Sequence, residues 1–273
     1  MYKNQKGFTL IELSIVVVVI ALIVAGVVAG QSLVKQAKLR SVVNDFNKYK
    51  TAYNSFYLQY GGIPGDMTNA YDFWGDEGAV CADTRINVGG CNGDGDGYIG
   101  YGLKPANPIY LYAYSRDEEY KLWQFLALSG HIKGSYDGIR NADYKPGINV
   151  PTAPIGGATA VYRFGYGNKY ERWTTPTNLN SNNIKGNNFL ELAKVGSINT
   201  RVTVSILTTA EAKNIDSKID DSLPHTGKLL GSTGSVMSGT VPAHCADLMT
   251  GNNEYILGSG DVVSCIIYLK MDK

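Results

Sequence analysis

The chain has 273 residues, of which 44% are hydrophobic and 18% charged, and its formal net charge is +1. The balance of 25 Lys and Arg against 24 Asp and Glu gives no strong signal for nucleic acid and excludes a binder driven mainly by phosphate contacts. The length allows one membrane segment and one head of about 200 residues, and it leaves little room for a second full domain.

The first predicted element is an apolar helix over residues 8–30. At 1.5 Å rise per residue it is about 35 Å long, which is enough to cross a hydrocarbon core of about 30 Å. Glu12 lies near its start, and the segment contains no Lys, Arg or His. Because an ionised carboxylate in hydrocarbon costs several kcal/mol, we expect Glu12 to pair with a cation from outside the segment. The candidates are Lys6 and the amine that cleavage between Gly7 and Phe8 would create.

Residues 6–13 read Lys-Gly-Phe-Thr-Leu-Ile-Glu-Leu. This octapeptide resembles the leader junction of type IV prepilins and of the pseudopilins of type II secretion. In that family a membrane-embedded aspartyl peptidase cuts after the glycine and methylates the new N-terminal residue. The resemblance implies that residues 1–7 are a leader, that the cut falls between Gly7 and Phe8, and that Phe8 is N-methylated. It also implies that Glu12 pairs with the N-terminal amine of a neighbouring subunit.

Three other interpretations compete with this one: an ordinary secretory signal, a plain signal anchor and a chance match. A secretory signal has a shorter apolar core, and neither kind of signal accounts for Glu12 within the segment. The positive charges that flank the segment leave its orientation open, because Lys3 and Lys6 on one side face Lys35, Lys38 and Arg40 on the other. The resemblance and the cysteines must therefore decide the orientation.

The helical pattern continues beyond the apolar segment. Apolar residues recur at spacings of three to five through residues 31–58, which predicts an amphipathic stem continuous with the first helix. Together they give one helix over residues 8–57, about 75 Å long. The first break in the helical pattern is at residues 61–66, Gly-Gly-Ile-Pro-Gly-Asp. We expect the head to comprise residues 59–273. Major type IV pilins usually carry a proline within the apolar half, and its absence here makes a pseudopilin or minor pilin at least as fitting.

Within the head, capping-box patterns predict two helices. The first opens at residues 115–118 and closes at Gly130, and the second opens at residues 208–211 and ends at Pro224. We expect strands at residues 161–166, 201–207 and 262–269, and a long loop at residues 174–188. The predicted fold is α+β: a long N-terminal helix packed on a globular head with an antiparallel β-sheet, short helices and long loops.

The four cysteines form two local pairs in the sequence, Cys81 with Cys91 and Cys245 with Cys265. Four cysteines allow three connectivities, and the spacing favours the sequential one. An even count without C-x-x-C spacing favours disulfides over zinc. Disulfides place the head outside the cytoplasm.

A glycine-rich loop after the first cysteine pair matches the first half of an EF-hand calcium loop. Asn92, Asp94 and Asp96 occupy ligand positions 1, 3 and 5, and Tyr98 would contribute the position 7 carbonyl. Position 12 is Leu103, so the bidentate glutamate must come from elsewhere, for which the candidates are residues 117–119. The alternative is a glycine-rich turn whose aspartates are solvated. Calcium here is a candidate structural ion, and the predicted function requires no cofactor.

A second acidic group, Asp216, Asp220 and Asp221, lies on one side of the second capped helix, where a solvated face is favoured over a metal site. The sequence contains no H-E-x-x-H or G-x-S-x-G motif, so we expect no enzyme activity.

We expect a structural subunit of a type IV pilus-like or type II secretion pseudopilus filament. Its partners would be the prepilin peptidase, other copies and related pilins or pseudopilins, the inner-membrane assembly machinery and the membrane itself. It would cross a bacterial inner membrane once with its head in the periplasm, and then enter the filament. The alternatives are a minor or tip pilin that binds a surface, DNA or another ligand, and a membrane-anchored exoprotein that never polymerises.

Overall fold

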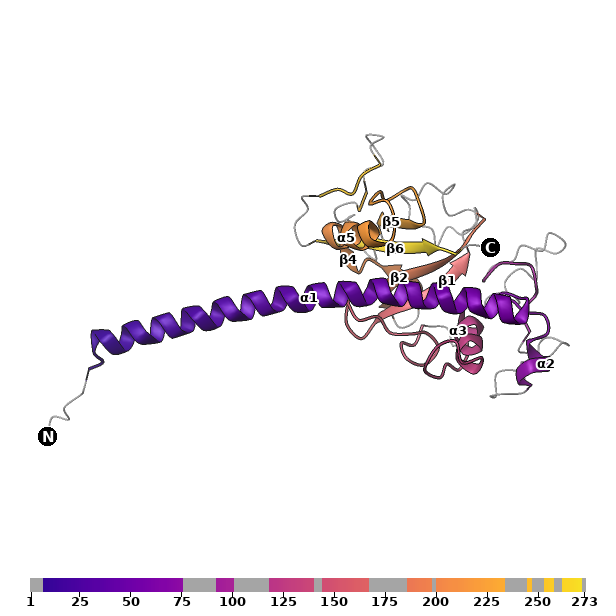
Figure 1. The fold of residues 1–273 in the computed structure, drawn as a ribbon, viewed down its shortest axis with the longest axis horizontal. Helices are drawn as coiled ribbons and strands as arrows, with labels where there is room; N and C mark the ends of the chain where they lie inside the picture. The colour runs from indigo at the N-terminus through magenta and orange to yellow at the C-terminus, as the bar shows by residue number, and fades with distance from the viewer. Residues whose placement is uncertain are drawn as a thin grey trace.

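The computed structural model describes residues 7–75, 92–100, 118–139, 144–166, 186–197, 200–233, 245–246, 253–257 and 262–271. These residues form one long helix, three shorter helices and a six-stranded sheet (Figure 1). All strand pairs of the sheet are antiparallel. The predicted α+β fold is confirmed.

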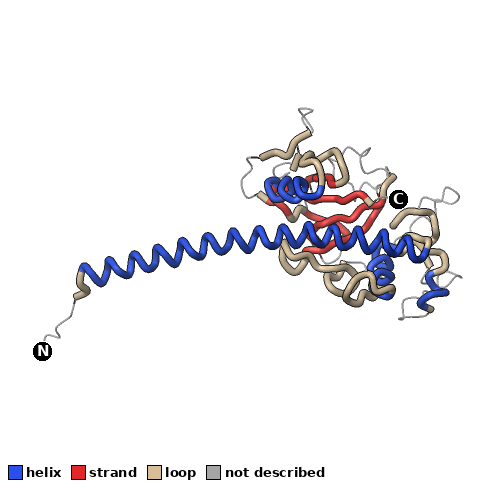
Figure 2. Tube along the Cα trace, in the orientation of Figure 1, coloured by secondary structure: helices blue, strands red, loops and turns tan. Residues whose placement is uncertain are grey.

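Helix α1 spans Leu10–Tyr60, 51 residues. Thr9 caps its start, and Gly61 ends it in the left-handed conformation with φ of 70°, which glycine adopts without steric cost. The N-terminal half of α1 projects away from the head, and its C-terminal half lies against the head (Figures 1 and 2). By length and composition α1 contains a segment able to cross a membrane, and none of that segment is buried in the head. The predicted helix therefore differs from the observed one by only two or three residues at each end.

The head is built on β1 (Ala160–Tyr166), β2 (Asn188–Ser197), β3 (Thr200–Val204), β4 (Leu207–Thr208), β5 (Leu229–Thr233) and β6 (Val263–Lys270). The main strand order is β1-β2-β6-β4, with β3 paired to β2 and β5 paired to β6. Strands β2 and β6 each pair with three others, so these two neighbouring strands form the centre of the sheet.

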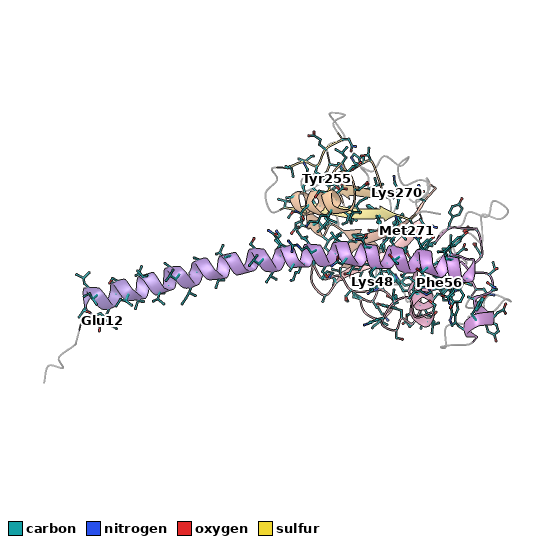
Figure 3. The ribbon with its side chains drawn as sticks, viewed as in Figure 1. Glu12, Lys48, Phe56, Tyr255, Lys270 and Met271 are labelled. Atoms are coloured by element: carbon teal, nitrogen blue, oxygen red, sulfur yellow. A yellow bond between two sulfur atoms is a disulfide. The ribbon has the colours of Figure 1, made fainter. Side chains whose placement is uncertain are left out.

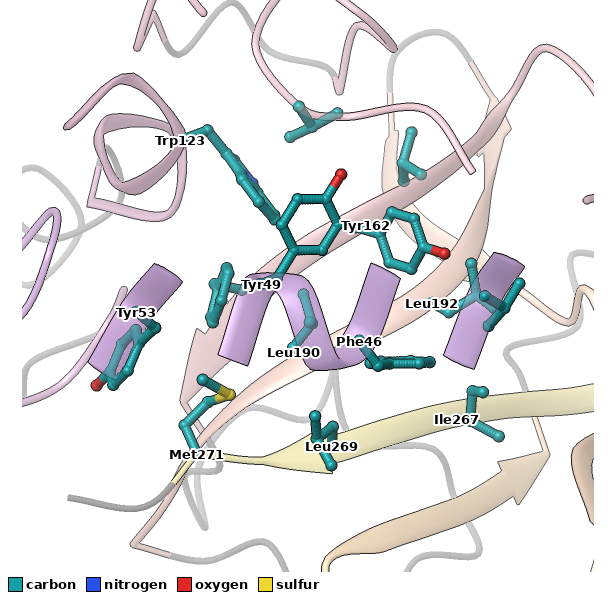
Figure 4. Packing of buried hydrophobic residues seen from close by; sticks show 14 of the residues in the cluster. Phe46, Tyr49, Tyr53, Trp123, Tyr162, Leu190, Leu192, Ile267, Leu269 and Met271 are labelled. Carbon is teal, nitrogen blue, oxygen red and sulfur yellow. The ribbon is translucent and has the colours of Figure 1, made fainter. Parts of the chain in front are cut away.

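One face of the sheet carries the C-terminal half of α1. Phe46, Tyr49 and Tyr53 of α1 point toward side chains of β1, β2 and β6 (Figure 4). Phe46 is fully buried, and its ring packs edge-on against that of Tyr162 with 5.7 Å between the ring centroids. The rings of Tyr49 and Trp123 also pack edge-on, with 4.9 Å between their centroids. Aromatic pairs of this geometry add about 0.5–1.5 kcal/mol each beyond the area that they bury. These aromatic contacts hold the head on the helix. We call the contacts of Phe46 and Tyr49 with Tyr162 and Trp123 the aromatic seam.

Three shorter helices complete the described head: α2 (Ala70–Trp74), α3 (Glu118–Leu128) and α5 (Thr209–Ile219). Helix α3 ends where predicted, before Gly130 at φ of 76°, while residues 115–117 of its expected capping box lie outside the described residues. Helix α5 starts as predicted, at the Thr208 capping box.

The predicted end of α5 at Pro224 is wrong. The helix stops at Ile219, and Asp220 is its C-cap. The Asp220 carboxylate accepts hydrogen bonds from the backbone N–H groups of Lys228 and Leu229, which folds the chain back toward β5. Ser222 then takes a φ of 68°, a conformation that no helix interior contains.

The strand predictions are correct for β1 and β6 and incomplete elsewhere. The expected strand over residues 201–207 divides into β3 and β4, with a break at Ser205 and Ile206. Strands β2 and β5 were not predicted, and Asn188, expected in a loop, begins β2. Most of the expected loop at residues 174–188 lies outside the described residues.

Candidate assembly site and acidic clusters

The N-terminal end of α1 is organised by a capping box between Thr9 and Glu12. The Thr9 N–H and hydroxyl donate to Glu12 Oε2 at 2.8 and 2.9 Å, and the Glu12 N–H donates to Thr9 Oγ1 at 3.3 Å. Figure 3 shows Glu12 at the tip of the projecting helix, far from the head. The local role of Glu12 as a capping residue was not predicted, although a threonine three residues before a glutamate is the pattern of a capping box.

The helix beyond the capping box presents apolar side chains to its surroundings on every side. Phe8 is 90% exposed, and the residues that follow are exposed likewise. The exposed large apolar residues of this half are Leu10, Ile11, Leu13, Ile15, Val16, Val17, Val18, Val19, Ile20, Leu22, Ile23, Val24, Val27 and Val28. A helix that is apolar all round requires lipid or other protein as its environment.

Gly7 and Phe8, the predicted cleavage positions, lie just before α1. An ideal Cβ on Gly7 would meet no atom within 4 Å, so the fold imposes no packing requirement for glycine there. Residues 1–6 of the expected leader lie outside the described residues.

The predicted calcium loop is held by hydrogen bonds to Asp66, a residue that was not predicted to belong to it. Asp66 lies just after α1, and its carboxylate accepts hydrogen bonds from the N–H groups of Gly95, Asp96 and Gly97. One carboxylate oxygen each from Asp66, Asp94 and Asp96 lies within 4.8 Å of the others. We call these three residues the Asp66 cluster.

Several predicted ligands of this loop have other contacts. Asn92 Oδ1 accepts from the Tyr71 N–H at 2.9 Å, and the Tyr98 N–H donates to Asp96 Oδ1 at 2.9 Å. Glu118, a candidate for the missing glutamate, accepts from the N–H groups of Asp94 and Gly100. The calcium ion at this loop stays a prediction.

Burial sets the charge balance of the Asp66 cluster. The pKa of Asp66 is raised to about 6, mainly by burial; the backbone N–H donors of Gly97 and Gly95 lower it, and the nearby carboxylates of Asp96 and Asp94 raise it. Burial also raises the pKa of Glu118 well above its ordinary value. Because backbone donors reach both oxygens of Asp66 and of Glu118, these carboxyl groups are satisfied without a cation.

The predicted disulfide between Cys245 and Cys265 is confirmed, with a Cα–Cα distance of 5.0 Å. Cys265 belongs to the central strand β6, and the Cys245 N–H donates to Thr233 Oγ1 at the end of β5. The disulfide therefore fixes a loop to the middle of the sheet. Cys81 and Cys91 lie outside the described residues.

The second acidic group differs from its prediction. Asp216 is fully buried, so the expected solvated face is wrong for this residue. Its carboxylate accepts a hydrogen bond from the Tyr255 hydroxyl at 2.9 Å. Asp221 at the other end of the group is exposed, as expected.

Comparison with known proteins agrees with the N-terminal geometry. Residues 2–28 match the family described as the prokaryotic N-terminal methylation motif. The chain is also similar to prepilin peptidase-dependent protein D of Escherichia coli (strain K12), at 40% identity over 61 residues. That match covers 22% of this chain and 42% of the relative, so the chain spans less than half of the relative's length. No solved structure matches the chain.

The chain therefore combines a prepilin-type N-terminus, an apolar helix of membrane length and an α+β head. Its N-terminal segment carries the prepilin-type methylation motif, and there the chain is similar to a prepilin peptidase-dependent protein.

Proposed function

We propose that this chain is a structural subunit of a pilus-like or pseudopilus filament, cut between Gly7 and Phe8 and assembled through the apolar half of α1. The observation that supports the proposal most directly is the position of Glu12. It is an acidic residue within the matched motif, at the start of α1, and the apolar side chains of the N-terminal half of this helix are exposed and not packed on the described head.

Packing of identical helices would bury the exposed apolar half of α1, and Glu12 would set the register of that packing. An ionised carboxylate in an apolar assembly is costly unless a cation meets it. Cleavage would place a new amine on Phe8, four residues from Glu12, in every subunit. A neighbour shifted along the filament axis would leave both charges unpaired, so the pairing favours one register.

In this proposal the chain crosses the bacterial inner membrane once, with its head on the periplasmic side. The disulfide between Cys245 and Cys265 supports this orientation, because such bonds persist in oxidising compartments. The peptidase, other pilins or pseudopilins and the assembly machinery are the proposed partners. The proposed act is self-assembly, which needs no catalytic residue and no cofactor.

Two measurements test the proposal. Mass spectrometry of the mature chain should give Phe8 as a methylated N-terminal residue, and any other N-terminus contradicts it. Glu12→Ala should abolish incorporation into filaments, measured by shearing and immunoblotting, while the chain still accumulates in the membrane.

Thr9→Ala separates the two roles of Glu12. This substitution removes the hydroxyl of the capping box, at a cost of about 1 kcal/mol in helix stability, and it leaves the carboxylate in place. If Glu12 acts by intermolecular pairing, Thr9→Ala keeps most filament incorporation. Equal loss in Thr9→Ala and Glu12→Ala would mean that Glu12 serves only as a cap. Ser14→Ala, five residues after Thr9, is the control for polar substitutions in the segment.

A further inference from the structure

Three aspartates gather where α5 ends and the chain turns back toward β5. One carboxylate oxygen each from Asp216, Asp220 and Asp221 lies within 4.8 Å of the others. Asp216 is buried, Asp220 is half-buried and Asp221 is exposed, so the group opens to solvent on one side. We call these residues the α5 cluster.

The buried member of the α5 cluster has an unsatisfied oxygen. Asp216 has no exposed surface, and the Tyr255 hydroxyl donates to its Oδ2 at 2.9 Å. Its Oδ1 makes no hydrogen bond of acceptable geometry within the described residues, although the Ser222 N–H faces the carboxylate and lowers its pKa. A buried acceptor without a partner costs about 1–3 kcal/mol, and a bound ion is one way in which proteins satisfy such an atom. In the Asp66 cluster, by contrast, backbone donors reach both oxygens of the most buried aspartate.

The electrostatic surroundings of the α5 cluster increase the cost of holding three carboxylates close together. Within the described part of the chain, no Lys, Arg or His forms an ion pair with any of its three carboxylates. Lys218, in the last turn of α5, donates to Asn214 Oδ1 instead. The C-terminal end of a helix carries partial negative charge, which disfavours carboxylates and favours a cation.

The α5 cluster also has its ligands held in place by the backbone. Asp220 Oδ2 accepts from the Lys228 and Leu229 N–H groups, and Asp221 accepts from the Leu223 N–H and the Thr226 hydroxyl. Each aspartate is thus fixed by a different part of the turn or by the neighbouring loop. A cation among them would connect α5, the turn after it and the loop that carries Tyr255.

We propose that the α5 cluster binds a hard divalent cation, best matched by Ca²⁺, through the carboxylates of Asp216, Asp220 and Asp221. Ca²⁺ takes six to eight oxygen ligands at about 2.3–2.6 Å, so two ligands on opposite sides stand up to about 5 Å apart. The oxygen spacing in the α5 cluster lies within that range. Water completes the coordination on the open side at Asp221. Burial first, and then Asp221 and Asp220, raise the pKa of Asp216 to about 7, and a bound cation would reverse this effect.

The test uses the full chain in detergent, freed of metal with a chelator and then titrated with Ca²⁺. Calorimetry should show that Asp216→Asn and Asp221→Asn each lose one Ca²⁺ per chain, or bind it at least tenfold more weakly. Ca²⁺ at a hundredfold excess over its Kd should raise the Tm of the wild-type head by about 5 °C or more, and this rise should be lost in both variants.

The matched control is Asp94→Asn, which alters the Asp66 cluster and should keep the binding that Asp216→Asn loses. Tb³⁺ gives a local readout, because Tyr255 lies against Asp216 and should transfer excitation to a lanthanide bound there. Asp221 is exposed, so Asp221→Asn tests the proposal even where Asp216→Asn does not fold. Unchanged stoichiometry, affinity and Tb³⁺ emission in Asp221→Asn overturn the proposal. So does a gain in Ca²⁺-free stability in Asp216→Asn without loss of binding, which would show that Asp216 is held protonated. The proposal does not depend on filament assembly.

Discussion

The two halves of α1 form one continuous helix, yet the side chains of one half are exposed and many of those of the other half are buried in the head. The N-terminal half exposes aliphatic side chains such as Val18 at 59%, and the C-terminal half buries aromatic ones such as Phe46 at 0%. Backbone hydrogen bonds are the same in both halves, so the difference lies in the side chains. Aliphatic residues all round the helix suit lipid or packed copies, while a single aromatic stripe suits one sheet face. A single helix can therefore serve two different packing surfaces.

The largest expected effect is on the packing of the C-terminal half. Phe46→Ala should lower the free energy of unfolding of the head by about 3–5 kcal/mol, because it opens a cavity between α1 and the sheet beside Tyr162. Val18→Ala is the matched substitution in the exposed half and should leave head stability unchanged. Denaturant titration of the full chain in detergent, followed by tryptophan fluorescence, measures both. Equal effects of the two substitutions would contradict the division of α1 into two halves.

A smaller effect is expected at the end of the helix. Gly61→Ala should destabilise the head by about 1–2 kcal/mol, because an L-residue pays that cost in the left-handed conformation, whereas space for the added methyl group is available. Gly26→Ala, in the interior of the exposed half, also adds a methyl group that meets nothing. It should not lower the Tm, since alanine favours helix. Thermal unfolding followed by circular dichroism separates the two, and a Tm unchanged by Gly61→Ala would count against the cap.

The smallest expected effect is a pH dependence of head stability that arises from Asp45, beside the aromatic seam. Burial raises the pKa of Asp45, while the hydrogen bond from the Tyr162 hydroxyl and the charge of Lys48 lower it. The folded state thus holds this proton more tightly than the unfolded state does. The contribution to stability is complete below the ordinary aspartate value and is lost as pH rises through the folded pKa. Asp45 is half-buried, so solvent screening keeps the change below about 1 kcal/mol.

Asp45→Asn should remove this fall in stability between acidic and neutral pH, and Tyr162→Phe should steepen it by deleting a hydrogen bond that lowers the pKa. The unfolding free energy measured at several pH values tests both. A wild-type pH profile in Asp45→Asn would show that other groups cause the dependence.

The sequence predicted elements whose signals are local. The break at Gly61, the capping box of Thr208 and Glu211, and the pairing of Cys245 with Cys265 all depend on residues that are close in the chain. The long helix belongs with them, because its apolar residues repeat with helical spacing over about fifty positions. For such elements a short stretch of chain carries the whole physical reason for the structure.

Strand β2 shows where sequence reasoning fell short. Glu191, in the middle of the strand, is fully buried, which hides the apolar alternation that marks a strand. It is paired with Arg163 directly opposite on β1, so the charge that argues against a buried strand is compensated by another segment. No local pattern reveals this compensation.

The sequence by itself determined the long helix, its end at Gly61, the prepilin-type junction and the place of Glu12, because local spacing and side-chain chemistry are sufficient for them. Only the tertiary structure decided that Asp66 joins the loop of Asp94 and Asp96, and that Asp216 is buried beneath a turn with one oxygen unsatisfied. These facts depend on which distant segments meet. Burial and charge pairing arise from contacts between segments that are far apart in the chain, and the spacing of residues along the sequence does not reveal those contacts.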